Sequence, residues 1–410
     1  MEIVHQVCAG VDVHKERIAV CVRVVGGDGK ANRQVRTFGT MTHQIEELRV
    51  WLEGFGVTDV AMESTGVFWK PIWNILCGHF ELHLVNPRHM KNVPGRKTDV
   101  KDCEWICQLL QFGLLRSSFV PSQAIRQLRE LTRSRTKLVQ QTATVVNRIH
   151  KVLQDANVKL SSVASDIMGV SARDMLRAIV QGENDPNRLA EMARRRLRAK
   201  IPELRLALNG TVNDHHRFLL HRYLTQIDFL EAETRLFDER IRDATAPFEE
   251  LIQLLDTIDG IDRRTAECLI AEIGPDMNQF HSAGALASWA GMCPGNHESA
   301  GKHKSGKTTK GSRWLQRTLA EAAWAASRTK NTYLSAQYKR LAARRGRNRA
   351  IVAVGHSILI AAYHVLKHHV PYRDLGSDYF DKLHRTRLTR YFVRRLEDLG
   401  NDVILREKTA

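Results

Sequence analysis

The first 120 residues alternate between stretches with the periodicity of strands and stretches with the periodicity of helices. Runs rich in β-branched residues and bounded by polar or glycine-containing turns predict strands. Amphipathic stretches with early acidic residues and a closing glycine predict helices. The predicted strands cover 7–13, 17–25, 34–38, 59–65 and 81–87, and the predicted helices cover 42–54, 68–80 and 97–115. Three successive strands followed by alternating helices and strands indicate an α/β domain with a mixed sheet.

From Ser122 the pattern changes to that of long helices. Apolar residues follow a heptad-like stripe from about 122 to 152 and again from about 204 to 241. These stretches predict a helical hairpin or coiled coil between two domains. The alternative is an ordinary helical bundle with no role in dimerisation. The segment GENDPN at 182–187 predicts a loop and a boundary between the two stretches.

The rest of the chain predicts a mostly helical domain. Residues 254–274 have the pattern of a helix, a tight turn at Gly260 and a second helix. The longest apolar run, 351–366, is short for a bilayer span and contains two histidines, so we expect a buried helix and no membrane partner. The expected domains are an α/β domain (1–120), a helical coiled-coil linker (121–250), a third domain (251–385) and a basic tail (386–410).

Charge is distributed unevenly over these regions. The formal net charge of +17 favours a polyanionic partner, nucleic acid first and an anionic membrane surface second. Residues 1–120 hold 14 Lys and Arg against 13 Asp and Glu, whereas 296–349 hold 14 against 2. The surface for nucleic acid is therefore expected in the third domain.

The N-terminus shows no basic segment followed by an apolar stretch and a cleavage site, so we expect a cytoplasmic protein that associates with the nucleoid when it acts. Seven scattered cysteines fit a reducing compartment better than a disulfide framework. Cys103 and Cys107 are four apart on a predicted helix. Because no second ligand pair accompanies them, we expect buried thiols rather than a zinc site.

Four carboxylates of the first domain lie where a metal site would need them. Asp12 lies in the strand GVDVH, Glu63 ends the strand in AMEST, and Asp99 and Asp102 are three apart at a helix start. Asp99 and Asp102 have a plainer explanation as solvated carboxylates favoured by the helix dipole. Asp12 is harder to explain as a solvated carboxylate, because a carboxylate within an apolar strand needs a cation or hydrogen bonds. Carboxylate oxygens suit Mg²⁺, with Mn²⁺ as the alternative.

The order of strands and helices, with acids on the first strand, the fourth strand and the last helix, resembles the ribonuclease-H-like domain of Holliday-junction resolvases. The segments GVDVHKE, MESTGVFWKP and VNPRHMKNVPGRKTDVKDCEWICQLL resemble the DEDD transposases of the insertion-sequence-110 family, the RNA-guided bridge recombinases. The resemblance extends over most of the chain. It implies a RuvC-like fold whose Mg²⁺ site is formed by Asp12, Glu63, Asp99 and Asp102.

The stretch GKHKSGKT at 301–308 matches the pattern of a phosphate-binding P-loop. A P-loop needs a strand before its first glycine and a helix directly after its Lys-Thr pair. The upstream sequence predicts a loop instead, and TTKGS delays the next helix to about Arg313. We therefore expect no nucleotide hydrolysis, and a flexible basic loop that contacts DNA phosphates is the simpler reading.

Residues 254–274 resemble a helix-hairpin-helix, a motif that holds a DNA phosphate at its turn, although Asp262 replaces the usual second glycine. The alternative is a packed helical hairpin that never contacts DNA. The expected nucleic-acid contacts are Gly260, Lys302, Lys304, Lys307, Lys310 and Arg313.

The segment GMCPGNHESAGKHKSGKTTKGSRWLQRTL looks like the family's transposase domain, in which a serine followed by a small residue and glycine is the nucleophile. That pattern falls on Ser299, with Ser305 as its nearest competitor. The resemblance implies a transposase that recombines donor and target double-stranded DNA through a serine-linked intermediate. It also implies a structured bridge RNA and a homo-oligomer, a dimer or tetramer, with the acids and the serine in the same or in different subunits.

Two other functions fit the same residues. The first is a metal-dependent hydrolytic nuclease, in which the acids cut with water and Ser299 only contacts phosphate. The second is a non-catalytic nucleic-acid-binding protein.

Overall fold

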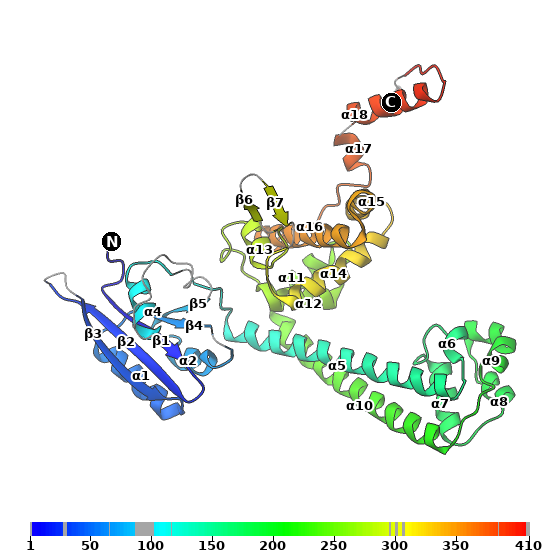
Figure 1. Cartoon of the computed structure of the whole chain (residues 1–410), viewed down its shortest axis with the longest axis horizontal. Helices are drawn as coiled ribbons and strands as arrows, with labels where there is room; N and C mark the ends of the chain where they lie inside the picture. The colour runs from blue at the N-terminus through cyan, green and yellow to red at the C-terminus, as the bar shows by residue number, and fades with distance from the viewer. Residues whose placement is uncertain are drawn as a thin grey trace. The chain divides into compact units, whose positions relative to one another are not determined.

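The computed structural model describes residues 2–27, 31–64, 66–86, 102–115, 117–294, 297–299, 302–305, 308–383 and 385–406, with only the backbone of 297–299 and 302–305. The chain divides into two compact units, Met1–Pro121 and Ser122–Ala410 (Figure 1). Asp99 and Lys307, two of the residues singled out in the sequence, lie outside the described residues.

The first unit is built on a mixed sheet, as the sequence predicts. In its described part the strands pair in the order β3-β2-β1-β4-β5. β1 is antiparallel to β2 and parallel to β4, and β4 is parallel to β5. The elements are β1 (Val7–Val13), β2 (Arg17–Val25), β3 (Ala31–Gly39), α1 (Thr42–Gly54), β4 (Asp59–Glu63), α2 (Trp69–Leu76), β5 (Glu81–Val85) and α4 (Asp102–Gln111).

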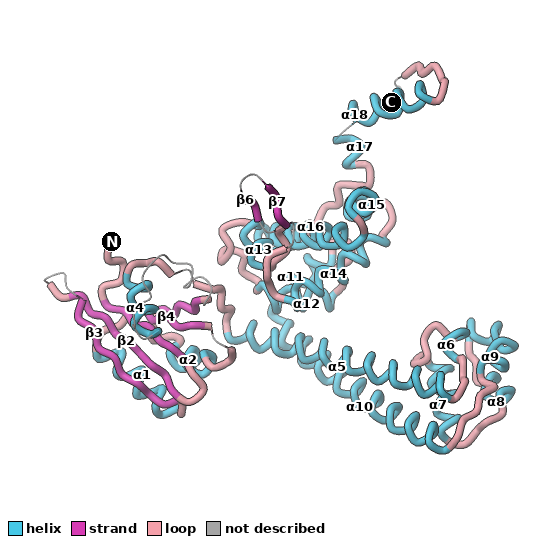
Figure 2. The backbone as a smooth tube through the Cα atoms, in the orientation of Figure 1, coloured by secondary structure: helices cyan, strands magenta, loops and turns pink. Residues whose placement is uncertain are grey.

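The sheet carries helices on both faces because its inner strands are apolar on both sides (Figure 2). Val11 and Met62 face the core formed with α1 and α2. Cys8 and Ala61 face the other way, into a core formed with α4. Alternation along β1 therefore places Asp12 on the α4 side of the sheet.

The second unit begins with two long helices, α5 (Gln123–Asp155) and α10 (Asp214–Thr245), which pack side by side (Figure 1). The predicted single stretch from 204 to 241 is wrong at its start, because α9 (Ile201–Ala207) ends before α10 begins. Between them, Thr211 N donates a hydrogen bond to Ala156 O, and a Cβ at Gly210 would lie only 2.5 Å from the same oxygen.

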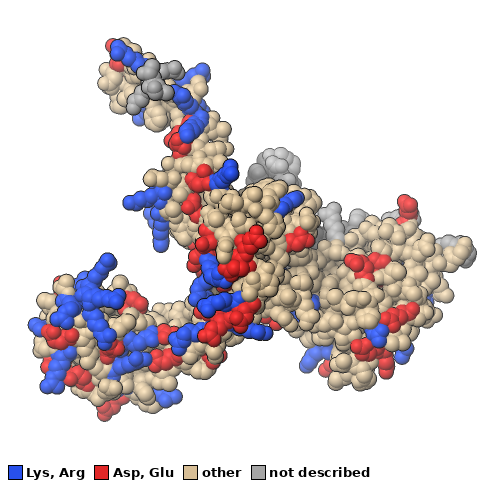
Figure 3. All heavy atoms as spheres, turned by 180° about the vertical axis from the view of Figure 1, so that it is seen from behind, with Lys and Arg blue, Asp and Glu red and all other residues tan. Residues whose placement is uncertain are grey.

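Residues 156–210 form a helical lobe at the end of this pair, where the sequence predicts only a loop at 182–187. The turn is present, since Asp185 caps α8 (Pro186–Glu191) by accepting a hydrogen bond from Asn187 N. The lobe also contains α6 (Leu160–Val163), α7 (Val170–Val180) and the 3₁₀ helix η1 (Arg195–Lys200). Its apolar residues join those of α5 and α10 in one core, and Lys and Arg side chains project from its surface (Figure 3).

The described residues of the last part of the second unit are mostly helical and include one hairpin. Its elements are η2 (Ala246–Phe248), α11 (Glu249–Asp256), α12 (Arg263–Ile273), α13 (Ala283–Trp289), β6 (His297–Ser299), β7 (Lys302–Ser305), α14 (Arg313–Arg328), α15 (Tyr333–Arg345), α16 (Arg347–His368), α17 (Tyr379–Leu383) and α18 (Arg385–Asp398).

Among the described residues, α16 is the one helix long and apolar enough to cross a membrane, and 56% of its most apolar window is buried. It packs against α11, α13, α14 and α15. Ile351, Val354 and Ile358 are buried in these contacts, so the prediction of a buried helix over 351–366 is confirmed.

Candidate active site

Two of the predicted acids lie side by side at the carboxyl ends of parallel strands. The register of β1 and β4 pairs Val11 with Met62, so the next residues are Asp12 and Glu63. Paired positions of neighbouring strands project from the same face and lie about 5 Å apart. The strand pairing therefore brings together two carboxylates that are 51 positions apart in the sequence.

Helix α4 brings a third acid to the same edge of the sheet. Gln111 O, at the end of α4, accepts a hydrogen bond from Val4 N, and Cys107 Sγ donates to Cys8 O. A Cβ at Gly10 would lie 2.4 Å from Cys103 O, so only glycine lets the start of α4 come this close to β1. The helix thus runs antiparallel to β1, and its first residue, Asp102, lies at the end where β1 reaches Asp12.

Asp12 has a close partner that the sequence did not single out. His14 Nε2 lies 3.0 Å from Asp12 Oδ2, and the Asp12 side chain is 17% exposed. His14 stands in the segment GVDVHKE, but no sequence signal assigns it a role, because its contact with Asp12 arises only where the chain turns after β1. At the start of α4, Glu104 accepts a hydrogen bond from Arg33 NH1 at 2.7 Å.

This donor set fits a hard cation, since it consists of carboxylate oxygens gathered at one sheet edge. In the part of the chain that the structure describes, no three His, Cys, Asp or Glu side chains converge closely enough to hold a metal ion. The fourth predicted acid, Asp99, lies outside those residues. Asp12, Glu63 and Asp102 thus lie at the same edge of the sheet but do not enclose an ion in the described structure.

Buried thiols fill the contact between α4 and β1. Cys103 and Cys107 are free and fully buried, as the sequence predicts, and Cys107 Sγ lies 3.9 Å from Cys8 Sγ. Burial raises the pKa of Cys103 to about 12, so this thiol is protonated at neutral pH. These cysteines act as small apolar residues that let α4 lie close to β1.

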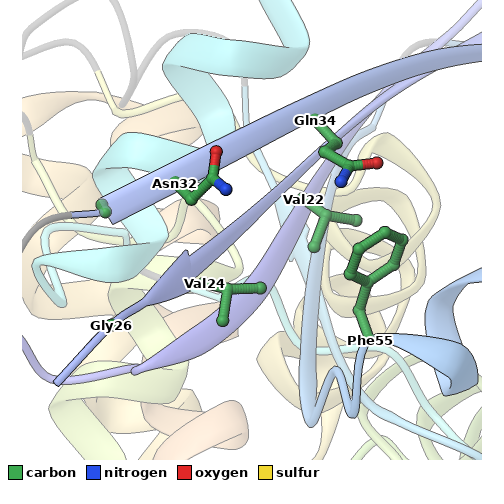
Figure 4. A pocket seen from close by; sticks show the side chains of 7 residues that line it. Val22, Val24, Gly26, Asn32, Gln34 and Phe55 are labelled. Atoms are coloured by element: carbon green, nitrogen blue, oxygen red, sulfur yellow. The ribbon is translucent and has the colours of Figure 1, made fainter.

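A hollow of about 520 Å³ at the opposite end of the sheet does not resemble a catalytic site. It is lined by Val22, Val24, Asn32, Gln34 and Phe55, together with Gly26 and Ala31, and the Phe55 ring faces the strands (Figure 4). Val24 pairs with Val7, whereas Ala19 pairs with Asp12, so the hollow is remote from the acids. The described residues of its lining include no acid, base or nucleophile.

The stretch around Ser299 forms a hairpin rather than the predicted flexible loop. β6 and β7 are antiparallel, with Ser299 opposite Lys302 and His297 opposite Ser305. The expectation that no strand precedes Gly301 is therefore wrong. A P-loop remains excluded, because residues 302–305 of the motif form a strand that pairs antiparallel with β6. In a P-loop these residues would form a loop that leads into a helix.

The base of the hairpin is held by close backbone packing. Pro294 and Thr308 form a bridge across it. A Cβ at Gly291 would lie 2.6 Å from Gly311 N, so the two segments meet backbone to backbone at this pair of glycines. Gln316 Nε2 donates a hydrogen bond to Gly291 O at 3.0 Å. The two segments that enter and leave the hairpin are therefore fixed to the start of α14.

Two of the predicted phosphate contacts lie where the chain leaves the hairpin. Lys310 and Arg313 are exposed just after β7, Arg313 at the first position of α14. Lys302 and Lys304 lie within β7, where the structure describes the backbone alone. The predicted cations thus follow one another along the hairpin and its exit.

An ion pair with a buried carboxylate connects the start of α14 to the long helix α5. Arg133 donates to both carboxylate oxygens of Glu272, at 2.7 and 2.8 Å, and the Glu272 side chain is 4% exposed. Ser312 Oγ, the N-cap of α14, donates to Glu272 Oε2 at 2.9 Å. Arg129 donates to Ala271 O and Glu272 O at the end of α12. No sequence pattern predicts this network, because its members come from three distant segments.

Gly260 lies away from the hairpin. It forms the turn between α11 and α12 with a φ of 86°, and a Cβ there would lie 2.3 Å from Ala322 O in α14. Asp262 accepts a hydrogen bond from Thr265 N and caps α12, which explains the missing second glycine. Close packing against α14 therefore accounts for Gly260, and its contact with DNA remains a prediction.

The neighbouring Asp259 gives a stability prediction. Its Oδ2 atom is buried and has no hydrogen-bond partner in the described structure. Burial and the nearby Asp374 carboxylate raise the pKa of Asp259 above its ordinary value of 3.8. The folded protein holds the proton of Asp259 more tightly than the unfolded chain does. This preference stabilises the fold fully below that ordinary value, and the stabilisation is lost as the pH rises through the folded-state pKa. Asp259→Asn is therefore expected to raise the Tm at pH 7, with a gain that shrinks toward pH 4.

Thermal unfolding between pH 4 and pH 7.5 checks this prediction. Asp256→Asn is the matched control, because Asp256 is an exposed carboxylate at the end of α11. The control should leave the Tm within about a degree of the wild-type value, as most exposed substitutions do. A Tm of Asp259→Asn below that of the wild type at pH 7 would contradict the assignment.

The sheet order of the first unit and the mostly helical second unit define a ribonuclease-H-like domain joined to a helical domain. Residues 9–158 match the family model of the DEDD transposase domain of IS110 elements, described as "Transposase". Residues 252–339 match the model "Transposase IS116/IS110/IS902 family". The chain belongs to the IS110 family of transposases, which are DNA-processing enzymes. No curated protein matches it.

Proposed function

We propose that this transposase cuts and rejoins DNA through a covalent bond to Ser299, with Asp12, Glu63, Asp99 and Asp102 holding Mg²⁺. The observation that carries the proposal is that Asp12, Glu63 and the start of α4 lie at one edge of the sheet. Bound Mg²⁺ or Mn²⁺ would offset the charge that develops on a phosphodiester during displacement. Domains of this family are typically metal-dependent.

In the proposed reaction the Ser299 hydroxyl attacks a DNA phosphorus. A bond forms between Oγ and phosphorus, the bond between phosphorus and the 3′ oxygen breaks, and the serine proton leaves as the 3′ oxygen gains one. The 3′ hydroxyl of a partner strand then attacks the 5′-phosphoserine, which rejoins DNA and restores the serine. Because each of the two steps forms one phosphoester bond as it breaks another, the reaction needs no nucleotide cofactor. This agrees with a hairpin in place of a P-loop.

The acids and the serine belong to different compact units of the chain. We propose that the acids and the serine act on one phosphate, within one subunit or between subunits of a dimer or tetramer. The exposed cations Lys310 and Arg313 would hold the flanking backbone, with Lys302, Lys304 and Lys307 along the hairpin. Family resemblance supports a bridge RNA that pairs with donor and target DNA.

Mass spectrometry of the covalent product tests the proposal. The wild-type protein is incubated with Mg²⁺, RNA transcribed from the non-coding flank of the element and duplex DNA carrying the element ends, then denatured and digested with trypsin. Ser299 falls in the peptide 265–302 and Ser305 in the peptide 305–307, so the two candidates separate cleanly. We expect a nucleotide on the first peptide. A nucleotide on the second would reassign the nucleophile, and cut DNA without any adduct would support a hydrolytic nuclease.

A further inference from the structure

A basic surface lies on the helical lobe, at the far end of α5 from the ion pair of Arg133 and Glu272. The lobe begins where α5 ends, at Asp155. With a rise of 1.5 Å per residue, this is about 33 Å along the helix from Arg133. We call this surface the arginine cluster, and it consists of Arg194, Arg195, Arg196, Arg198 and Lys200.

Three arginines of the cluster are free of ion pairs. Arg195, Arg196 and Arg198 are exposed, and no carboxylate in the described part of the chain pairs with any of them. The two outer members are engaged, since Arg194 NH2 donates to Asp174 at 2.7 Å and Lys200 Nζ donates to Val163 O. Most of the other arginines of the lobe do have acidic partners, as Arg173 has Glu231 and Arg205 has Glu191. Three unpaired guanidinium groups within the four residues 195–198 indicate a site for an external anion.

The backbone at Arg195 has an unusual conformation. Among the described residues that are not glycine, positive φ occurs at Asn157, Asn331, His369 and Arg195. Asn and His tolerate this region better than most side chains, so Arg195 stands apart. Such a conformation costs on the order of 1–3 kcal/mol and persists only where the surroundings fix it. Here the chain is fixed by Arg194 N, which donates to Ser171 Oγ in α7.

The cluster borders a hollow of about 650 Å³ between η1 and the start of α7. Arg194, Arg195, Arg196 and Lys200 form one wall, and Ser165, Gly169 and Ser171 contribute to the other. Asp166 also lines the hollow, where its Oδ1 atom accepts a hydrogen bond from Met168 N. The hollow therefore presents more cations than anions, with hydroxyl groups that can donate to phosphate oxygens.

The composition of the lobe identifies the kind of nucleic acid. Residues 156–210 contain no Phe, Tyr, Trp or His, so the lobe offers no aromatic ring to stack on an unpaired base. Single strands are typically bound by stacking on aromatic side chains together with a basic groove. Duplex backbones need only cations and hydrogen-bond donors. The chain is also a member of a transposase family, whose substrate is DNA.

We propose that the arginine cluster is a second DNA-binding surface, which holds the phosphate backbone of duplex DNA without reading its sequence. Arg195, Arg196 and Arg198 each neutralise a phosphate, and the hollow beside them receives the sugar-phosphate edge. This surface shares no residue with the proposed reaction.

The test is the salt dependence of binding by the full-length protein to a labelled 40-base-pair duplex DNA of arbitrary sequence. Each lost phosphate contact reduces the slope of log affinity against log salt by about 0.9. Replacing Arg195, Arg196 and Arg198 together by Gln is expected to reduce that slope by roughly 2 to 3. Replacing the same three by Lys should keep most of the slope. Because these side chains are exposed, the Tm should remain that of the wild type.

A matched triple variant separates a specific surface from general charge. Lys159, Arg188 and Arg205 lie on the same lobe outside the cluster, and changing them to Gln removes the same charge. If both triple variants weaken DNA binding equally, the proposal is overturned. It is also overturned if the cluster variant binds duplex DNA normally but loses affinity for duplex RNA of the same sequence. Binding is measured without any strand cleavage, so the result is independent of Ser299.

Discussion

Ser299→Ala is expected to form no covalent adduct with DNA and to lose strand joining to below about one part in 10⁴ of the wild-type rate. Alanine lacks the oxygen that would displace the 3′ oxygen, and no other hydroxyl takes its place in the turn of the hairpin. Ser299 is the last residue of β6 and pairs with Lys302, whereas Ser305 pairs with His297 at the base. The measurement is a denaturing gel of labelled DNA, on which the adduct migrates as a protein-sized band.

Ser305→Ala is the matched control for this variant, since it removes the same hydroxyl from the partner strand of the same hairpin. It is expected to keep adduct formation. The opposite pattern, with the adduct lost in Ser305→Ala alone, would move the nucleophile to β7. Normal cutting without an adduct in Ser299→Ala would leave a nuclease that uses water.

Asp12→Asn is expected to reduce strand cleavage by at least about a hundredfold while DNA binding stays near the wild-type affinity. Even groups that only orient a metal ligand cost about 10- to 100-fold when removed, and Asp12 is proposed as a direct ligand. Asparagine preserves the shape of the side chain and its amide oxygen still faces His14, so the sheet edge should remain folded. Parallel assays of cleavage and of duplex binding, with and without a chelator, provide the measurement.

Glu16→Gln is the control for charge near the site, because Glu16 is exposed in the turn between β1 and β2 and does not lie on the sheet. It should cut DNA at the wild-type rate. If Asp12→Asn and Glu63→Gln both retain full cleavage, the acids do not hold a catalytic ion. A wild-type protein that binds DNA but cuts none would instead be a non-catalytic DNA-binding protein.

The first domain could be predicted closely because its signals are local. Runs such as RIAVCVRVV specify a strand by themselves, and β2 spans 17–25 as predicted. Local signals do not predict the site, since only the register of β1 against β4 makes Asp12 and Glu63 neighbours. The sequence motif nevertheless named both residues, because the family resemblance carries that long-range information.

The hairpin and the lobe could not be predicted by the same means. β6 and β7 consist of His, Glu, Ser and Lys, which have weak strand propensity, so these strands depend on each other and on the glycines at 291 and 311. In the lobe, short helices of four to eleven residues depend on packing into one core with α5 and α10. Neither feature leaves a periodic pattern in the sequence.

The ion pair between Arg133 and Glu272 has a mechanical consequence. Turning α5 away from α12 would leave the carboxylate of Glu272, which is 4% exposed, without its guanidinium partner, and an unpaired buried charge is unfavourable. Glu272 also holds Ser312, from which α14 starts directly after the hairpin. The first turns of α5, the end of α12 and the exit of the hairpin therefore behave as a single rigid joint. A movement of α5 against α12 would therefore also disturb the N-cap of α14, just after the hairpin.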